Sequence, residues 1–396
     1  KTDNPGETSD KQIKIPTFPG ETYLYSVDWG DGNIETDLTT SAIHTYASSG
    51  IYTVKIYGGF PRIYFSHGGD KDKILTIEQW GTTKWTSMES AFGGCTNLNI
   101  TNLSIDTPDL SLIKSMHGMF GLASNFNGVI GNWDVSKVEY ITAVFSGATS
   151  FNQNINNWDI SGAISISGLF KEASAYNQPL NNWDVTNVTS LDGVFEGATS
   201  FNQNINNWDT SNVTDMYSAF SDATAFNQPL NNWNTSKVTD MTFMFKSAST
   251  FNQDLNNWDV SKVEKMRSMF KDATVFNGNT TNWVTSSVTK MQAMFKNASA
   301  FNQDISNWDT SKVHDMNEMF LEATSFNQNL GAWDITSIIN NESDPEDLEG
   351  MQDMFEGVTL STENYDALLI GWSTDSSGIS NDGIDDIPTN IDFSGG

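Results

Sequence analysis

The chain has 396 residues, of which 37% are hydrophobic and 12% aromatic, so it holds enough apolar material for a folded core and is not disordered as a whole. Its 49 acidic and 20 basic side chains give a net charge of −29, which repels phosphate backbones and excludes nucleic acid as a partner. No apolar run reaches the ~18–20 residues of a membrane-spanning helix, so no membrane insertion is expected. The single cysteine, Cys95, excludes an intrachain disulfide and is expected to be a small buried core residue.

Residues 1–11 are polar and without periodicity, and they are predicted to be a flexible lead-in. From 12 to 66, short β-type runs alternate with turn signals, which predicts a small β-sandwich. The stretches VDWGDG (27–32), HTY (44–46) and GIYTV (50–54) resemble the PKD family of immunoglobulin-like modules. That resemblance implies an extracellular spacer or interaction module without catalysis.

Residues 67–115 are predicted to form an N-terminal cap and a first, degenerate repeat, because a repeat array must cover the apolar face of its end unit. The repeats proper are assigned to 116–358, where tryptophans recur at an interval of 25 residues. A fixed period of this size indicates a solenoid, whose units bury their apolar faces by stacking. The tryptophans are Trp133, Trp158, Trp183, Trp208, Trp233, Trp258, Trp283, Trp308 and Trp333.

The repeat spanning 211–236 illustrates the predicted local structure. Val213, Met216, Phe220 and Ala223 recur at spacings of three, four and three, which predicts a short helix from about 212 to 224. Residues 226–230 alternate apolar and polar side chains, which predicts a strand. The predicted fold class is therefore an α/β solenoid, with one short parallel strand and one short helix in each 25-residue turn, behind an N-terminal β-sandwich.

An asparagine follows the aromatic residue in all nine units. Stacked asparagines can hydrogen-bond to the Asn above and below, or to turn backbone, so a structural ladder is favoured over a row of ligands. The members are Asn127, Asn152, Asn177, Asn202, Asn227, Asn252, Asn277, Asn302 and Asn327.

A second polar column follows the tryptophan, and in two turns it carries Asn234 or Val284 in place of aspartate. Capping of the predicted helices explains the carboxylates, because helix N-termini offer N–H donors and a positive dipole end. Bridging Ca²⁺ between turns is the alternative, and under capping no cofactor is required. The candidate metal ligands are Asp134, Asp159, Asp184, Asp209, Asp259, Asp309 and Asp334.

The position two residues after the repeated asparagine varies and is expected to face outward, because proline is found there in two turns. Its polar members are the candidate ligand-binding residues. They are Asn154, Asn204, Asp254, Asn279, Asp304 and Asn329.

The array is interrupted by a polar insertion at 336–350, and in solenoids such insertions form loops that often bind partners. Residues 359–396 are predicted to form a C-terminal cap, built on an amphipathic helix near 360–372, and an acidic tail. No Lys or Arg follows Lys312, whereas eighteen acidic residues do, so this end should attract cations or a basic partner, or serve solubility.

The units follow the pattern F-N-Q-x-[IL]-x-x-W-D-x-S-x-V-x-x-M-x-x-M-F, preceded by AFGGCTNL at 91–98. From 87 to 372 the chain resembles the BspA-like leucine-rich-repeat surface proteins of bacteria. The resemblance implies a leucine-rich-repeat-like solenoid on the cell surface or secreted, which acts in adhesion or binding. The expected partner is a glycan or protein on another surface, and the expected state is a monomer.

Enzyme activity is not expected, because the four histidines are scattered and no phosphate loop, HExxH or G-x-S-x-G motif occurs. The leading hypothesis is a binding module that displays a polar, acidic surface. The alternative is a stiff acidic spacer without its own ligand, and a glycan-active enzyme with two acids in a groove is the least favoured interpretation.

Overall fold

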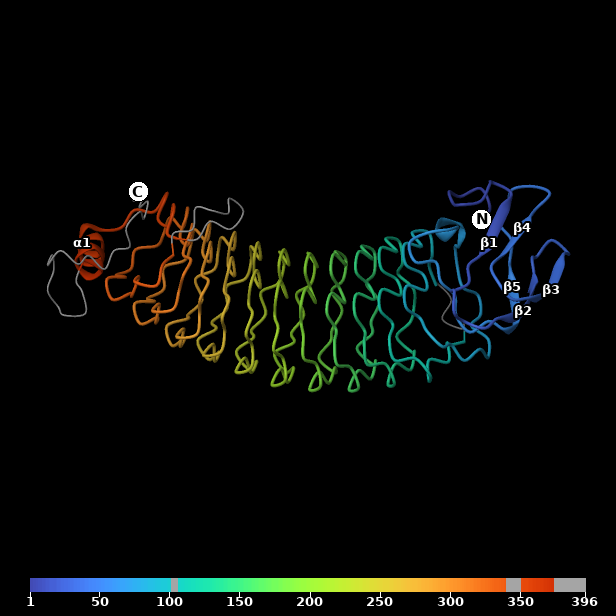
Figure 1. Ribbon diagram of the computed structural model, residues 1–396, viewed down its shortest axis with the longest axis horizontal. Coiled ribbons are helices and arrows are strands. Elements are labelled where there is room, and N and C mark those ends of the chain that lie inside the picture. The colour runs from blue at the N-terminus through green and yellow to red at the C-terminus, as the bar shows by residue number, and fades with distance from the viewer. Residues whose placement is uncertain (101–105, 340–349, 374–396) are drawn as a thin grey trace. The chain divides into compact units, whose positions relative to one another are not determined.

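The computed structural model describes residues 1–100, 106–339 and 350–373, and the chain divides into two compact units, Lys1–Val188 and Thr189–Gly396 (Figure 1). Residues 340–349, within the predicted insertion, and the predicted acidic tail at 374–396 lie outside the described residues. Among the described residues, none belongs to a helix long and apolar enough to span a bilayer.

The first unit begins with five short strands in two antiparallel sheets (Figure 1). In one sheet β1 pairs with β4, and in the other β2 lies between β3 and β5. Trp29 and Tyr46 are buried, and the Tyr46 hydroxyl donates to the Trp29 carbonyl at 3.0 Å. The β-type runs of 12–66 therefore do form strands, which are β1 (Gln12–Ile15), β2 (Leu24–Asp28), β3 (Ile34–Leu38), β4 (Ala42–Thr45) and β5 (Lys55–Gly59).

Residues 1–11 are folded against this module, contrary to the predicted flexible lead-in. The ammonium group of Lys73, at the end of the 3₁₀ turn η1 (Lys71–Lys73), is buried and donates to the carbonyls of Thr8, Ser9 and Gln12 at 2.9–3.0 Å. Asp70 is also buried and accepts from the Thr8 N–H. A buried ammonium group must be surrounded by acceptors, and this requirement holds the N-terminal segment in place.

Within 67–115, the region assigned to the N-terminal cap and first repeat, a single bridge takes the place of the expected edge strand. Thr76 forms an isolated parallel bridge with Asn99, and the Asn99 N–H donates to the Leu75 carbonyl at 2.9 Å. Cys95 is fully buried, and burial raises the pKa of its thiol well above the usual range. The prediction of a core cysteine is confirmed.

The repeats of both units contain no helix within the described residues, so the predicted α/β solenoid is wrong. In the stretch from 212 to 224, N–H groups of Met216 and Ser218 donate to carbonyls of the next turn, at 3.1 and 2.9 Å. Other N–H groups of this stretch, such as that of Ala219, which donates to the Met216 carbonyl, close i→i−3 turns. Ser218 and Asp222 have φ of 50° and 58°, in the left-handed region that a right-handed helix does not enter.

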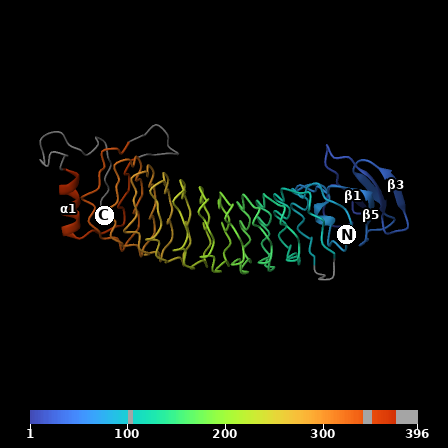
Figure 2. The same ribbon diagram turned by 90° about the horizontal axis from the view of Figure 1, so that it is seen from below.

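The apolar spacing misled the prediction because consecutive three-residue turns return side chains to one face almost as a helix does. Val213, Met216, Phe220 and Ala223 are all fully buried, as predicted. The N–H groups of Met216 and Phe220, however, donate to carbonyls of the neighbouring turn, whereas those of Val213 and Ala223 close i→i−3 turns. Each turn is therefore a chain of tight turns stacked on the next, as the successive backbone loops of each unit show (Figure 2).

The predicted strand at 226–230 is not a strand either. The parallel contacts lie at another position of the turn, as isolated bridges such as Asp215 with Asp240 and Asp240 with Lys265. At 226–230 the N–H of Asn227 donates instead to a side chain, that of Asn202. Side-chain acceptors thus replace a continuous parallel sheet along this edge.

Aromatic side chains form the core. In the second unit, Phe220 and Phe245 stack with ring centroids 5.5 Å apart, and Phe245 and Phe270 follow at 5.6 Å. The buried indole N–H of Trp233 donates to the carbonyl of Ile205 in the preceding turn at 3.1 Å. A buried indole needs such an acceptor, so each tryptophan fixes both packing and register.

The helix predicted near 360–372 is confirmed as α1 (Thr362–Trp372), the one α-helix of the described residues (Figure 1). It reproduces the contacts of a missing turn, because Trp372 donates to the Leu330 carbonyl at 3.1 Å and Asn364 donates to the Asn327 side chain at 2.9 Å. A side chain at Gly371 would collide with the backbone of Gly331, so the helix lies directly on the last repeat.

Candidate functional site

The asparagine ladder, the nine repeated asparagines, is structural within each unit. A side-chain oxygen accepts the backbone N–H of the next asparagine, at 2.9–3.0 Å in the first unit and 2.8–3.0 Å in the second. The accepting residues are Asn127, Asn152, Asn202, Asn227, Asn252, Asn277 and Asn302. In most turns the same oxygen also accepts from the following glutamine, as Asn227 does from Gln253 at 2.8 Å. The predicted ladder is confirmed in its second form, with turn backbone as the donor.

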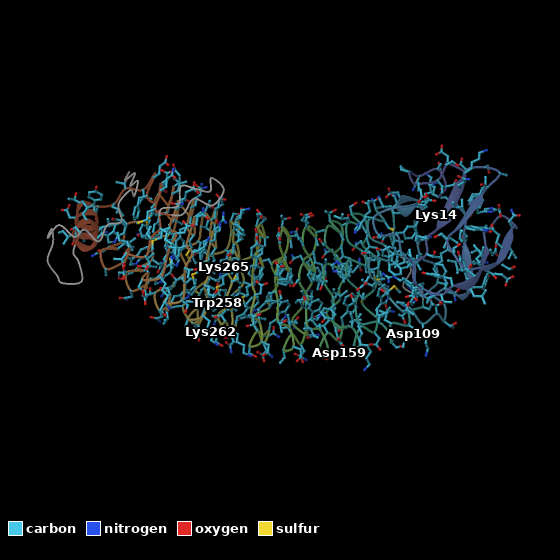
Figure 3. The ribbon with its side chains drawn as sticks, viewed as in Figure 1. Lys14, Asp109, Asp159, Trp258, Lys262 and Lys265 are labelled. Carbon is cyan, nitrogen blue, oxygen red and sulfur yellow. The ribbon has the colours of Figure 1, made fainter. Side chains whose placement is uncertain are left out.

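The aspartate column caps turns. Each side-chain oxygen accepts the N–H two residues further on, at 2.9–3.1 Å, and Asn234 does the same. Asp109 and Asp159 lie along one edge of the first unit (Figure 3) and are bonded in the same way to Ser111 and Ser161. Capping is therefore the observed role, although the capped element is a turn and not the predicted helix.

The same hydrogen bonds explain the acidity of this column. The Ser261 hydroxyl and N–H hold the pKa of Asp259 below its usual value, and Thr186 does the same for Asp184. Across the residues that the structure describes, no three acidic, histidine or cysteine side chains gather closely enough to hold a metal ion. Each of the seven candidate metal ligands accepts a capping bond within its own turn.

The candidate ligand-binding residues also belong to turns. Asn154, Asn204, Asn279, Asp304 and Asn329 each accept the N–H two residues later at 2.9–3.0 Å. Asp254 accepts from the Asn279 N–H at 2.9 Å. All six are at least partly exposed, so the structure places them on the surface while giving each a structural bond.

At a different set of positions the residue type changes from turn to turn. This set comprises the residue nine positions after each tryptophan, with its counterpart in the opening turn, and we call it the variable column. In the first unit its members are His117, Thr142 and Ser167, and in the second they are Asp192, Tyr217, Thr242, Arg267, Gln292 and Asn317. Most are partly or fully exposed, whereas Thr242 and Asn317 are buried.

Two residues of this face were missed by the sequence analysis. Tyr217 is 39% exposed and stands where other turns carry small or polar residues. Phe243 follows the variable column in its turn, at a position with positive φ that is otherwise Gly, Ala, Ser, Glu or Asp in the described turns. An aromatic residue that departs from its own column was the available signal, but the helical interpretation hid it.

Comparison with known families gives one finding. The model of the family described as "Mycoplasma protein of unknown function, DUF285" matches three stretches, 86–191, 178–283 and 253–364. Together they cover the repeats and the beginning of α1, and more than half of the chain. No curated protein and no solved structure matches the chain.

Proposed function

The chain belongs to the DUF285 repeat family, and on this premise we propose that it is a binding protein whose stacked turns present side chains to a partner. The turns supply a rigid support, and recognition uses the positions that differ from turn to turn. We extend the proposal to a secreted or cell-surface location in a bacterium and to adhesion, as the resemblance to BspA-like surface proteins implies.

The proposal rests on one observation: the repeated columns hold the turns together, and the variable column does not repeat its residues. The asparagine ladder and the aspartate column repeat their residues, and their side-chain oxygens accept hydrogen bonds from backbone N–H groups. The variable column changes from histidine to tyrosine to arginine, so the scaffold does not dictate its chemistry. Where the fold does not require a particular residue at a surface position, the residue is free to be suited to a partner.

The proposed partner is a glycan or a protein on another surface. A net charge of −29 supports neither nucleic acid nor an anionic membrane as the partner. The proposal is for a monomer that binds without catalysis and without a required cofactor.

An array of glycans and of extracellular proteins, probed with the labelled full chain, tests the proposal. We expect retained binding to a restricted set of partners. A chain that binds no partner on either array contradicts the proposal and favours the spacer alternative. A spacer can then be recognised because deleting whole turns from it reduces its function in proportion to length, whatever turns are removed.

A further inference from the structure

We propose that Tyr217, Phe243, Lys246 and Arg267, here called the aromatic–cation patch, bind a saccharide that carries a carboxylate. The inference rests on the proposed binding function and assigns it a site and a ligand class. All four residues belong to the second unit and come from three consecutive turns.

The aromatic half of the patch is a ring pair that reaches the surface through Tyr217, which is 39% exposed, and the partly exposed Phe243. The rings of Tyr217 and Phe243 meet edge to face, with centroids 5.6 Å apart and an interplanar angle of 88°. By contrast, stacked pairs such as Phe220 and Phe245 lie in the buried core of the described repeats. An exposed aromatic face suits the apolar C–H face of a sugar ring, and the tyrosine hydroxyl can bond to its rim.

Phe243 is maintained at a cost to the fold. Its φ is 58°, a conformation that is strained for a bulky residue, and the same position is Gly168 and Gly193 in two other turns. Most of the surface of Phe243 is covered, and part of it remains open to solvent. Positive φ recurs at this position, as Ser218 and Ser268 show, so the bulky ring and not the backbone sets Phe243 apart from its column.

The other half of the patch is cationic. Lys246 lies with its Nζ 6.0 Å from the centroid of the Phe243 ring and 4.0 Å from Asp222. Arg267 follows two turns after Tyr217 in the variable column, and within the described chain no ion pair joins it to an acidic side chain. A guanidinium group binds a carboxylate through two parallel N–H bonds, which makes Arg267 the expected anchor of the acidic group.

The dimensions favour a short saccharide over a protein partner. Tyr217 and Arg267 are separated by two turns, and each turn advances 5.5–5.6 Å by the spacing of the core phenylalanines. A stable protein interface covers about 800 Å² on each partner, far more than these four side chains present. Lys265, on the same turn as Trp258 and Lys262 (Figure 3), is 54% exposed but paired with Asp240 at 3.2 Å, so it adds positive potential and is not itself the anchor.

Binding of the full chain to immobilised oligosaccharides that carry galacturonic, glucuronic or sialic acid tests the proposal, with the methyl ester of each as the uncharged match. We expect at least one acid to bind, and its ester to bind about tenfold more weakly or worse. Binding to none of the acids, or equal binding of acid and ester, overturns the proposal. A partner found among neutral glycans or proteins in that case would leave the proposed function standing.

Three variants use residues that the chain already places in the same columns, namely Tyr217→Ser, Phe243→Gly and Arg267→Ser. Each should weaken binding of the acid by about tenfold or more. Binding is measured well below the melting temperature of each variant, so that weaker binding does not reflect unfolding. A merely structural Phe243 would leave binding of the acid unchanged in the folded Phe243→Gly variant. Tyr140→Ser is the matched control, because Tyr140 is an exposed aromatic residue of the first unit that lies outside the variable column, and Ser115 and Ser165 hold its position in the neighbouring turns. It should bind as the unmodified chain does.

Discussion

In the stacked turns, an asparagine side chain accepts the backbone N–H that a carbonyl would accept in a parallel sheet. Asn227 accepts the N–H of Asn252 at 3.0 Å and the Gln253 side chain at 2.8 Å. The backbone at 226–230 buries Phe226 and Leu230 in the core and forms no strand. The acceptor is therefore a side chain. Each ladder asparagine is therefore a structural residue despite its partial exposure.

Asn227→Ala should lower the free energy of unfolding by about 1–2 kcal/mol, since two donors lose their acceptor at a site that water only partly reaches. Chemical denaturation measures the change. Asn227→Asp retains a side-chain oxygen at the same place and should lose less. Equal losses for the two variants would mean that the hydrogen bonds of the ladder do not matter.

The aspartate column gives a pH dependence at the same scale. The pKa values of Asp184 and Asp259 are lowered in the folded state by bonds from Thr186 and Ser261. A lowered folded-state pKa adds stability that is fully present above the unfolded pKa and is lost as the pH falls through the folded value. Stability should thus be level at neutral pH and fall below about pH 4.

The variant Asp259→Asn checks this, because Asn234 already occupies the column and makes the same turn bond. It should remove part of the acid sensitivity in melting curves recorded from pH 7 to 3 and leave the neutral melting temperature nearly unchanged. An acid-sensitivity profile identical to that of the unmodified chain would show that the capping bond does not control it.

At the scale of the element, the sequence predicted the ends of the array better than its repeating unit. The period of 25, the buried face and the helix α1 all follow from apolar spacing, which records which side chains are inside. The repeating unit does not, because helices and runs of i→i−3 turns bury the same residues. What separates them is the destination of N–H groups such as that of Met216, whose partner Asp240 is far away in sequence.

The candidate site was predictable to a similar degree. The ladder and the capping aspartates follow from repetition and hydrogen-bonding chemistry. Tyr217 and Phe243 could not be recognised as neighbours, because a helix would have turned successive residues of this stretch to different faces. Only the stacked turns bring them together across the repeat.

The contact between α1 and the last repeat gives a prediction for this element. Gly371→Ala places a methyl group against the Gly331 backbone, and the helix must shift to avoid it. We expect about 1–3 kcal/mol of destabilisation and faster proteolysis within 362–372, as overpacking of a close contact requires. Ala367→Gly on the same helix keeps the close approach open, and it should cost only the helix propensity of about 1 kcal/mol. Equal cleavage of the Gly371→Ala variant and the unmodified chain would show that α1 is not seated on Gly331.

At the scale of the whole molecule, stacked rings and ladder hydrogen bonds join successive turns within each unit. The aspartates that could have bridged turns through Ca²⁺ are each bonded within their own turn. Adding millimolar Ca²⁺ should therefore leave the melting temperature unchanged, whereas a metal that binds only the folded chain must raise it. Magnesium at equal ionic strength is the control, and a rise specific to Ca²⁺ would restore the bridging interpretation.

In the proposed function, the repeated columns form the scaffold and the variable column forms the recognition surface. One multiple variant tests this separation. The variant carries serine at three positions of the variable column in the second unit. Two belong to the aromatic–cation patch, Tyr217 and Arg267, and the third, Gln292, lies one turn further along; all three are exposed or partly exposed. We predict that this chain melts within about 3 °C of the unmodified protein, because no core or ladder contact changes, and that it loses binding to the partners found on the arrays. Retained binding, or loss of the fold, would contradict the account.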